Sequence, residues 1–199
     1  PDFYEVAKQV SDYENRSKNL LEKIESLKQD NSEKAKKEIK LLQQKDTYGE
    51  LQFDSLYIAV ENFQQLSLLS STLPYYDVDP KKIQYFGTSL WNKEAIIKEP
   101  GLNNSIFVAL DKDKSEVFYD LYQSLYNEVP HSIAIYGFDA IGIISSLNNQ
   151  NLEINEKNIV NEIGFSGLTG TFQFKNDGIV ERDLTLYRIK NEKIIKIKD

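Results

Sequence analysis

Six residues of this chain combine side-chain types and spacing that suit the binding of a small polar molecule. Each of two short apolar runs, 53–60 and 82–87, ends next to polar or aromatic side chains. A short continuous apolar run is typical of a buried strand in a parallel sheet. Ligands of open α/β sheets bind beyond the carboxyl ends of such strands. We therefore expect a binding site formed by Tyr57, Glu61, Asn62, Thr88, Ser89 and Trp91.

The chemistry of these side chains suggests a role for each. Glu61 can hold a ligand ammonium group, and Thr88 and Ser89 can hydrogen-bond a polar group. Trp91 can form an apolar or cation-stacking wall. Purely structural roles stay open, because Asn62 can cap the following helix and Trp91 can anchor the core.

No other group of residues indicates catalysis or metal binding. His131 is the only histidine, follows Pro130 and has no nucleophile pattern near it, and acid–base catalysis needs an oriented partner. The segment that starts at Asp111 resembles the start of a calcium loop, but Glu116 and Tyr122 stand where that loop needs glycine and glutamate. Phosphate loops and dinucleotide fingerprints are absent. We predict no catalytic residue, no metal and no cofactor.

Composition excludes several further classes. The 199 residues carry a net charge of −7, and a nucleic-acid binder needs a basic face. No apolar run approaches 18 residues, so we expect no membrane span. Cysteine is absent, which excludes disulfides, thiol catalysis and cysteine-ligated zinc. Because methionine is also absent and residue 1 is proline, we expect a fragment, a processed chain or a trimmed chain, with any signal peptide upstream.

The order of the predicted elements indicates an α/β fold with a mainly parallel sheet. Strands are expected at 53–60, 82–87 and 105–110. Helices are expected at 2–29, from a Ser32 cap to residue 42, after an Asn62 cap, at 117–125, from a Ser132 cap to 147, and at 156–163. The heptad spacing of 2–29 also permits a coiled coil, with an amphipathic helix as the favoured alternative.

Two of these helices have predicted inward faces. For 117–125, whose cap is expected at Asp113 or Ser115, the inward residues are Val117, Phe118, Leu121, Tyr122 and Leu125. For the helix after Ser132 they are Ile133, Tyr136, Ala140, Ile141, Ile144 and Leu147.

The end of the chain is predicted to be a β-hairpin. Phe172 and Phe174 alternate with polar residues, as in a half-buried strand. Lys175-Asn-Asp-Gly178 has the composition of a turn. Leu184 and Leu186 again alternate with other residues, and we predict that their strand pairs with the first.

Several segments together resemble the C-terminal part of type I periplasmic binding proteins. The hairpin residues Phe165, Gly167, Gly170, Phe174, Gly178, Arg182 and Leu184 match a family pattern. Tyr85-Phe-Gly-Thr-Ser-Leu-Trp91 and Glu99-Pro-Gly-Leu102 resemble segments of the second lobe. Ala134-Ile-Tyr-Gly-Phe-Asp-Ala140 is similar to the Tyr-Asp-Ala helix of the family, with Phe138 in place of the tyrosine.

The resemblance implies a three-layer α/β lobe closed by the hairpin, as the C-terminal fragment of a two-lobed fold. Residues 1–110 with 166–199 would form the second lobe, and 111–165 would be a helical segment that returns to the first lobe. On domain-size grounds, one to two hundred or so further residues are expected upstream.

Two groups within this superfamily compete. The first is the substrate-binding proteins of branched-chain amino acid transporters, which implies a small polar ligand and a transporter permease as partner. The second is the lipoprotein activators of penicillin-binding proteins, which act on peptidoglycan synthesis by protein contact. Asp12-Tyr-Glu-Asn-Arg16, Gly167-Leu-Thr-Gly170 and Arg182-Asp-Leu184 resemble the second group. Either group implies a non-enzymatic periplasmic protein, with any lipid anchor in an upstream segment.

Overall fold

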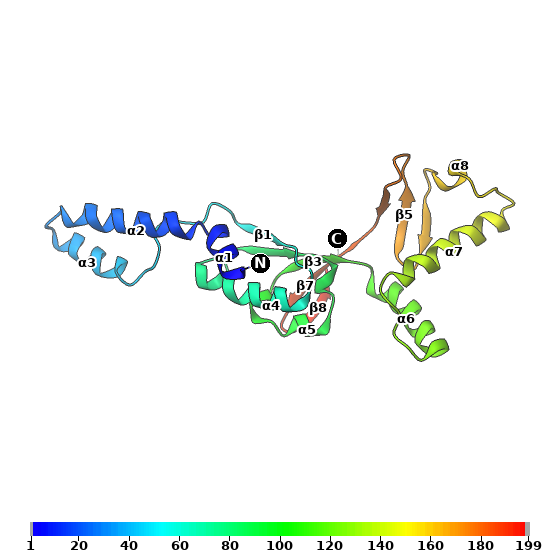
Figure 1. The fold of residues 1–199 in the computed structure, drawn as a ribbon, viewed down its shortest axis with the longest axis horizontal. Helices are drawn as coiled ribbons and strands as arrows, with labels where there is room; N and C mark the ends of the chain where they lie inside the picture. The colour runs from blue at the N-terminus through cyan, green and yellow to red at the C-terminus, as the bar shows by residue number, and fades with distance from the viewer. Residues whose placement is uncertain (1, 198–199) are drawn as a thin grey trace. The chain divides into compact units, whose positions relative to one another are not determined.

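Short apolar runs of the sequence form the central sheet. In the computed structural model, which describes residues 2–197, five strands lie in the order β1-β2-β3-β7-β8 (Figure 1). They are β1 (Ser55–Ile58), β2 (Gln84–Gly87), β3 (Ile106–Ala109), β7 (Thr185–Lys190) and β8 (Lys193–Lys196). The first three strands run parallel, with Ile58 paired to Gly87 and Gly87 paired to Phe107. The chain thus forms the predicted α/β fold with a mainly parallel sheet.

Helices connect these strands. The α-helices are α1 (Phe3–Val10), α2 (Tyr13–Lys28), α3 (Glu33–Leu42), α4 (Phe63–Thr72), α5 (Glu94–Ile97), α6 (Lys112–Tyr126), α7 (Ala134–Asn149) and α8 (Glu156–Ile159). Three 3-10 helices, η1 (Leu73–Tyr76), η2 (Ser89–Trp91) and η3 (Pro100–Leu102), complete the connections. Within residues 2–197 none of the helices has both the length and the apolar character that crossing a membrane requires.

The predicted helix over 2–29 is two helices, because the backbone turns at Asp12. Its φ of 50° lies in the left-handed region, which interrupts an α-helix but which aspartate tolerates better than most residues. The side chain of Asp12 also accepts a hydrogen bond from Asn15 Nδ2 at 2.7 Å. The heptad pattern thus predicts one continuous helix, whereas the chain bends at Asp12.

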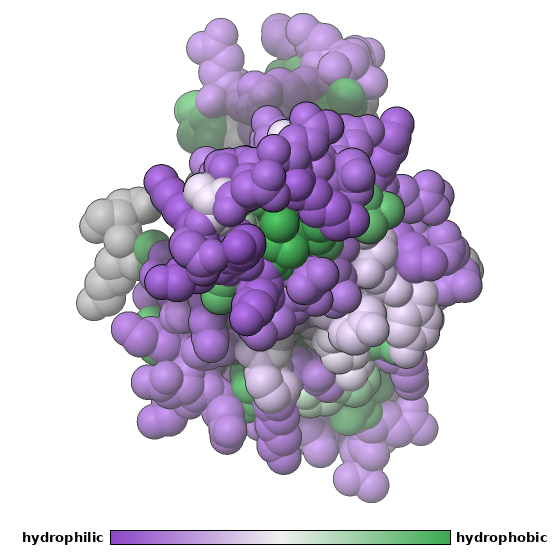
Figure 2. All heavy atoms as spheres, turned by 90° about the vertical axis from the view of Figure 1, so that its left-hand side faces the viewer, coloured by the Kyte–Doolittle hydropathy of each residue, from purple (hydrophilic) through white to green (hydrophobic). Residues whose placement is uncertain are grey.

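The helices α2 and α3 pack together as a helical hairpin (Figure 1). Ser32 caps α3 as predicted, accepting the backbone N–H of Ala35 at 3.1 Å. Leu20, Ala35 and Leu42 are buried, so the apolar stripe of α2 has its partner within the chain. The face of the molecule at this end is largely hydrophilic, with small apolar areas (Figure 2).

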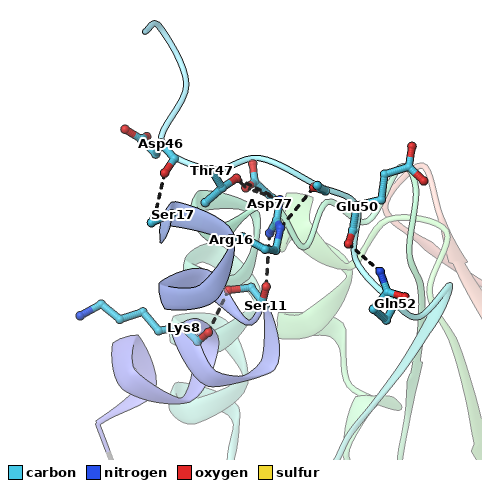
Figure 3. Close-up of polar contacts among 10 residues, drawn as sticks. Lys8, Ser11, Arg16, Ser17, Asp46, Thr47, Glu50, Gln52 and Asp77 are labelled. Carbon is cyan, nitrogen blue, oxygen red and sulfur yellow. Dashed lines mark hydrogen bonds and ion pairs between the residues drawn. The ribbon is translucent and has the colours of Figure 1, made fainter. Parts of the chain in front are cut away.

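A polar cluster at Arg16 ties the start of α2 to two loops (Figure 3). The Arg16 side chain is 9% exposed, and its guanidinium donates to a carboxylate oxygen of Asp77 at 2.9 Å. It also donates to the Thr47 hydroxyl at 3.0 Å and to the Ser11 and Gly49 carbonyls at 3.3 Å each. Thr47 in turn donates to Asp77 at 2.6 Å. The charge is therefore buried only with several partners in place, as a buried charge requires.

The chain divides into two compact units. Unit 1 holds residues 1–107 and 188–195, and unit 2 holds 108–187 and 196–199. Residues 165–182, which follow α8, therefore belong to the same unit as α6 and α7. The predicted assignment of 1–110 with 166–199 to one lobe of an intact protein stays a prediction, and its outermost residues, 1, 198 and 199, lie outside the described part of the chain.

Unit 2 contains a second sheet, which corrects the predicted closing hairpin. Its strands are β4 (Phe165–Gly167), β5 (Gly170–Phe174) and β6 (Val180–Arg182), paired antiparallel in that order. The turn at 175–178 is where the sequence predicts it. However, β5 pairs with β6, whereas Leu186 belongs to β7 of the other sheet. The chain passes between the sheets at 183–184, which alternation of apolar residues cannot reveal, because both strands have the same period.

The helices of unit 2 differ from prediction in their caps and in their inward faces. Of the five residues predicted to face inward on α6, only Phe118 is buried, whereas Val117, Leu121 and Leu125 are exposed. Asp111 caps α6, accepting the N–H of Asp113 at 3.0 Å, rather than Asp113 or Ser115. No side-chain cap bond is present at the start of α7, so Ser132 does not have its predicted role. The buried residues of α7 are Ile135, Asp139, Ile143 and Leu147. Of the six residues predicted to face inward, only Leu147 is among them.

Candidate functional site

The ends of β1 and β2 lie side by side in unit 1. Because the two strands are parallel and Ile58 pairs with Gly87, the segments that follow them leave the sheet at the same edge. The first segment carries Glu61 and Asn62, and the second carries Thr88 and Ser89. The register therefore brings together the two polar segments that the sequence selects. Whether they bind a ligand stays a prediction.

The first segment is an ordered helix start. Asn62 caps α4, its side-chain oxygen accepting the N–H of Gln65 at 3.0 Å. The Gln65 side chain accepts the N–H of Glu61 at 3.1 Å, one residue before the cap, whereas a capping box would use the N–H of Asn62. Glu61 also receives a long hydrogen bond of 3.4 Å from Gln65 Nε2. The Glu61 carboxylate is exposed, and no ion pair to it is found in residues 2–197.

The second segment, which carries Thr88 and Ser89, leads into the buried side chain of Trp91. Thr88 caps η2 by accepting the N–H of Leu90 at 3.3 Å, and Ser89 is exposed. Trp91 is fully buried and lies so close to Gly87 that a Cβ at that glycine would sit 2.1 Å from the indole ring. Its Nε1 has no hydrogen-bond partner within residues 2–197. In this structure Trp91 is a core side chain beneath the segment and has no surface that a ligand could touch.

Tyr57 differs from the other predicted site residues in its position. It lies within β1, paired with Phe86 of β2. The two side chains are 63% and 36% exposed, and paired residues share a sheet face. Tyr57 is therefore exposed on a face of the sheet, at the end of the strand but not beyond it. The sequence predicts a third layer, but within residues 2–197 none covers this side chain.

Unit 2 contains a buried carboxylate with several donors, here called the carboxylate clamp, that lies outside the site predicted from the sequence. Asp139 is buried and accepts the N–H groups of Leu168 and Thr169 at 2.9 Å each. The Thr169 hydroxyl also donates to Asp139 and accepts from Arg182. The guanidinium of Arg182 lies 4.3 Å from the centre of the Phe172 ring. A single acidic residue inside an apolar helix was the available signal, since a carboxylate is buried only where donors meet it.

A cavity of about 870 Å³ adjoins this clamp. Its lining comes mainly from α7, from α8 and the segment after it, and from β4, with Lys114 of α6 and Phe172 of β5. Ile143, Leu147 and Phe172 of its lining belong to one buried apolar cluster. Among its polar residues, Asn161 is already engaged, since its side-chain oxygen accepts the N–H groups of Ile163 and Gly164. The cavity lies outside the predicted site.

His131 and Asp111 have local structural roles. The His131 ring accepts the N–H of Ile133 at 3.3 Å and is exposed. Asp111 accepts a hydrogen bond from Lys196 at 2.6 Å. The hydrogen bond from the Lys196 ammonium is the main cause of the lowered pKa of Asp111; burial opposes it, and the backbone N–H of Asp113 lowers the pKa further. Among residues 2–197 no group of three or more acidic or histidine side chains is placed to hold a metal ion.

The class of fold follows from comparison with solved structures. The chain is structurally similar to type I periplasmic binding proteins and to a related regulatory domain, over part of their length. No protein-family model matches the sequence, and no curated protein matches it. The similarity is therefore one of fold.

Two structures illustrate the likeness. One, from Rhodospirillum rubrum, is described as a branched-chain amino acid ABC transporter. It is 16% identical with a TM-score of 0.59, and the match covers 72% of this chain and 44% of the Rhodospirillum chain. The other is the C-domain of LpoA (YraM) from Haemophilus influenzae, a regulator of PBP1A. It is 20% identical, has a TM-score of 0.52, and covers 81% of this chain and 49% of its own. The present chain thus spans less than half the length of each.

Proposed function

We propose that this chain is part of a non-enzymatic extracytoplasmic protein that captures a small polar solute, such as an amino acid, between two lobes. The observation that carries the proposal is the parallel register of β1 and β2, which brings the segments after Ile58 and Gly87 to one edge. In open α/β sheets this edge is where ligands bind. Each segment offers an exposed polar side chain there, Glu61 in one and Ser89 in the other.

The proposed roles follow from the contacts of each residue. The Glu61 carboxylate would receive a ligand ammonium group, and the Ser89 hydroxyl would hydrogen-bond a polar group. Asn62 and Thr88 are occupied as caps, so they would hold the two segments in place. Trp91 would support the second segment from below. Tyr57 would border the site from the sheet face.

The proposed mechanism is closure of two lobes about a hinge. We propose that residues 1–110 with 166–199 belong to the second lobe and that 111–165 returns to the first. Polypeptide beyond these residues would supply the rest of the first lobe. The location would be the periplasm, with any lipid anchor upstream, and a transporter permease would be the partner.

A thermal-shift screen of amino acids and short peptides on the full-length protein tests the proposal. A ligand that binds only the folded state at a hundred times its Kd adds about 2.7 kcal/mol of stability. We expect an ammonium-bearing ligand to raise the Tm, and Glu61→Gln to abolish the shift. Glu50→Gln, another exposed glutamate of unit 1, is the matched control and keeps it. Absence of a shift with every ligand would contradict the proposal.

The alternative is an activator of a penicillin-binding protein in peptidoglycan synthesis that acts by protein contact. What supports it is the likeness to the LpoA C-domain, which extends over 81% of this chain. This function needs no solute, so Glu61→Gln would be silent. It predicts that the full-length protein retains a penicillin-binding protein in a pull-down with purified components. Retention without any ligand-dependent Tm shift would favour this alternative.

A further inference from the structure

The cavity of about 870 Å³ in unit 2 has no part in the proposed function. All of its lining belongs to residues 114–172, so unit 2 forms it without any residue of unit 1. Ligand pockets of this volume are mostly apolar, with a few polar groups that orient the ligand. We call it the α7 cavity, because α7 contributes more of the lining than any other element.

The apolar part of the lining can hold a hydrocarbon body. Ile143, Leu147 and Phe172 are buried there, and Phe165 packs against them. The rings of Phe165 and Phe172 have their centres 5.9 Å apart. Each methylene group that a ligand transfers from water to such a surface strengthens binding. The α7 cavity therefore favours a molecule with an apolar body over a wholly polar one.

The available charges of the lining are positive. Lys114 of α6 and Lys157 of α8 both border the cavity, and neither has an ion pair within residues 2–197. Among the described residues, the one carboxylate in the lining is Asp139. Its oxygens already accept from the N–H groups of Leu168 and Thr169. A ligand in the cavity would thus meet two ammonium groups and no free carboxylate.

The absence of ion pairs at these two lysines contrasts with the charge of unit 2. Residues 108–187 contain twelve acidic side chains but only five of lysine or arginine. Three of the five have partners, which are Glu116 for Lys112 at 3.3 Å, Glu181 for Lys175 at 2.9 Å, and Thr169 for Arg182. The other two, Lys114 and Lys157, border the same cavity. The many carboxylates of the unit therefore leave both ammonium groups of the cavity available.

Ser146 adds a neutral donor to the lining. Its hydroxyl oxygen accepts from Gln150 Nε2 at 3.1 Å. The hydrogen of the hydroxyl has no acceptor within residues 2–197, so it can be donated to a ligand. A carboxylate is held best by charged and neutral donors together.

We propose that the α7 cavity binds a monocarboxylate with an apolar chain or ring. Lys114 or Lys157 receives the carboxylate, and the apolar part of the lining covers the body. An ammonium ligand has no partner here, in contrast to the site proposed at Glu61. The inference therefore goes beyond the proposed function and does not depend on it. The competing outcomes are an apolar void that does not distinguish charge and a cavity that takes up no ligand.

Isothermal titration of the full-length protein tests the inference with octanoate, octylamine, octanol and acetate. We expect octanoate to bind at least about tenfold more tightly than the other three, because only octanoate has both the charge and the apolar body. NMR locates the site, since octanoate should shift the amide signals of Gly164 and Gly167 in the lining. Equal binding of octanoate, octylamine and octanol would overturn the proposal, and so would the absence of octanoate binding.

Substitutions test the assigned residues. Lys114→Met combined with Lys157→Met changes two exposed side chains and should weaken octanoate binding about tenfold. Lys112→Met is the matched control, because Lys112 lies outside the lining and pairs with Glu116, and it should keep the affinity. Gly142→Phe should block binding, since Gly142 is in the lining and nothing lies within 4 Å of an added Cβ. Unchanged octanoate binding in the double variant would overturn the proposal.

The result can be separated from that of the amino acid screen. Glu61→Gln should leave octanoate binding unchanged, and the double lysine variant should keep any Tm shift that an ammonium-bearing ligand produces. Octanoate binding without such a shift would leave the α7 cavity standing and remove only the function proposed for Glu61. Octanoate binding that Glu61→Gln abolishes would overturn the assignment to the α7 cavity.

Discussion

The guanidinium of Arg16 lies 2.9 Å from the carboxylate of Asp77, 61 residues later in the chain. The two side chains differ in environment, since that of Arg16 is 9% exposed and that of Asp77 is 51% exposed. Asp77 ends η1 with a φ of 69°, in the left-handed region. The contact therefore joins the first turn of α2 to the segment that precedes β2.

Removing Arg16 should destabilise unit 1 more than removing its carboxylate partner. Arg16→Met keeps most of the buried volume but leaves Thr47, Asp77 and two carbonyls without their donor. We expect Arg16→Met to lower the free energy of unfolding by about 3 kcal/mol, as for breaking a buried ion pair. Asp77→Asn should lower the free energy of unfolding by only about 1 kcal/mol, because water reaches this side chain. Urea unfolding followed by circular dichroism measures both.

The control for this pair is Lys36→Met. Lys36 forms an ion pair with Glu33 on the surface of α3, where both side chains are more than half exposed. Its loss should change the free energy of unfolding by less than about 0.5 kcal/mol. An Arg16→Met variant as stable as Lys36→Met would refute a structural role for the cluster.

Asp139→Asn should loosen the start of β5 in unit 2. The carboxylate accepts from two backbone N–H groups and one hydroxyl, and an amide replaces one of its acceptors by a donor. We expect the free energy of unfolding to fall by about 2 to 3 kcal/mol. Hydrogen exchange resolves the effect locally, because the amides of Leu168 and Thr169 should lose protection. Asp120→Asn, at an exposed position of α6, makes the same charge change and should leave these amides protected.

Gly87→Ala should disturb the segment that carries Thr88 and Ser89. The added Cβ would lie 2.1 Å from the ring of Trp91, and this ring has no free space, since it is fully buried. Overpacking of this kind costs about 1 to 3 kcal/mol. Trp91 is the only tryptophan, so its fluorescence reports the displacement directly. Gly142→Ala is the control, because nothing lies within 4 Å of the added atom. It should leave the fluorescence spectrum unchanged and stabilise α7 by about 0.5 to 1 kcal/mol. An unchanged spectrum in Gly87→Ala as well would contradict the packing of Trp91 against Gly87.

Local sequence patterns predicted the elements whose signals are local. The three parallel strands lie within the predicted runs, and the caps at Ser32 and Asn62 are present, because short apolar runs and side-chain caps depend on neighbouring residues. The bend at Asp12 has no such signal, since nothing in the heptad pattern requires a left-handed residue there. The candidate site could be selected from strand order, but its register needed the structure.

The face of α7 was mispredicted for a different physical reason. The helix is apolar on two opposite sides, with Ile135 and Ile143 on one and Ile141 and Ile144 on the other. Periodicity selects an inward side only when the opposite side is polar. The predicted partner of β5 was wrong for a similar reason. The strands at 180–182 and 185–190 are both compatible with a hairpin, and only long-range packing decides which of them pairs with β5.

The ion pair between Asp111 and Lys196 gives a pH-dependent prediction. Their nitrogen and oxygen lie 2.6 Å apart, and the Lys196 ammonium is the main cause of the lowered pKa of Asp111. A carboxylate whose pKa is lower in the folded than in the unfolded state stabilises the fold above its unfolded pKa, about 3.9. That contribution is lost as the pH falls through the folded pKa. The pKa of Lys196 is raised, chiefly by Asp111, so its contribution is present below about pH 10.4 and is lost as the pH rises further.

Lys196→Met should therefore raise the pKa of Asp111 toward its ordinary value. It should also lower stability between about pH 4 and pH 10, with the difference from the unsubstituted chain fading outside that window. Carbon-13 NMR of the Asp111 carboxyl group measures the first effect, and urea unfolding at a series of pH values measures the second. Lys193→Met removes a charge from the same strand without touching Asp111 and should leave its pKa in place. An Asp111 titration that is identical in the Lys196→Met variant would show that the backbone cap of α6, and not the ammonium group, sets this pKa.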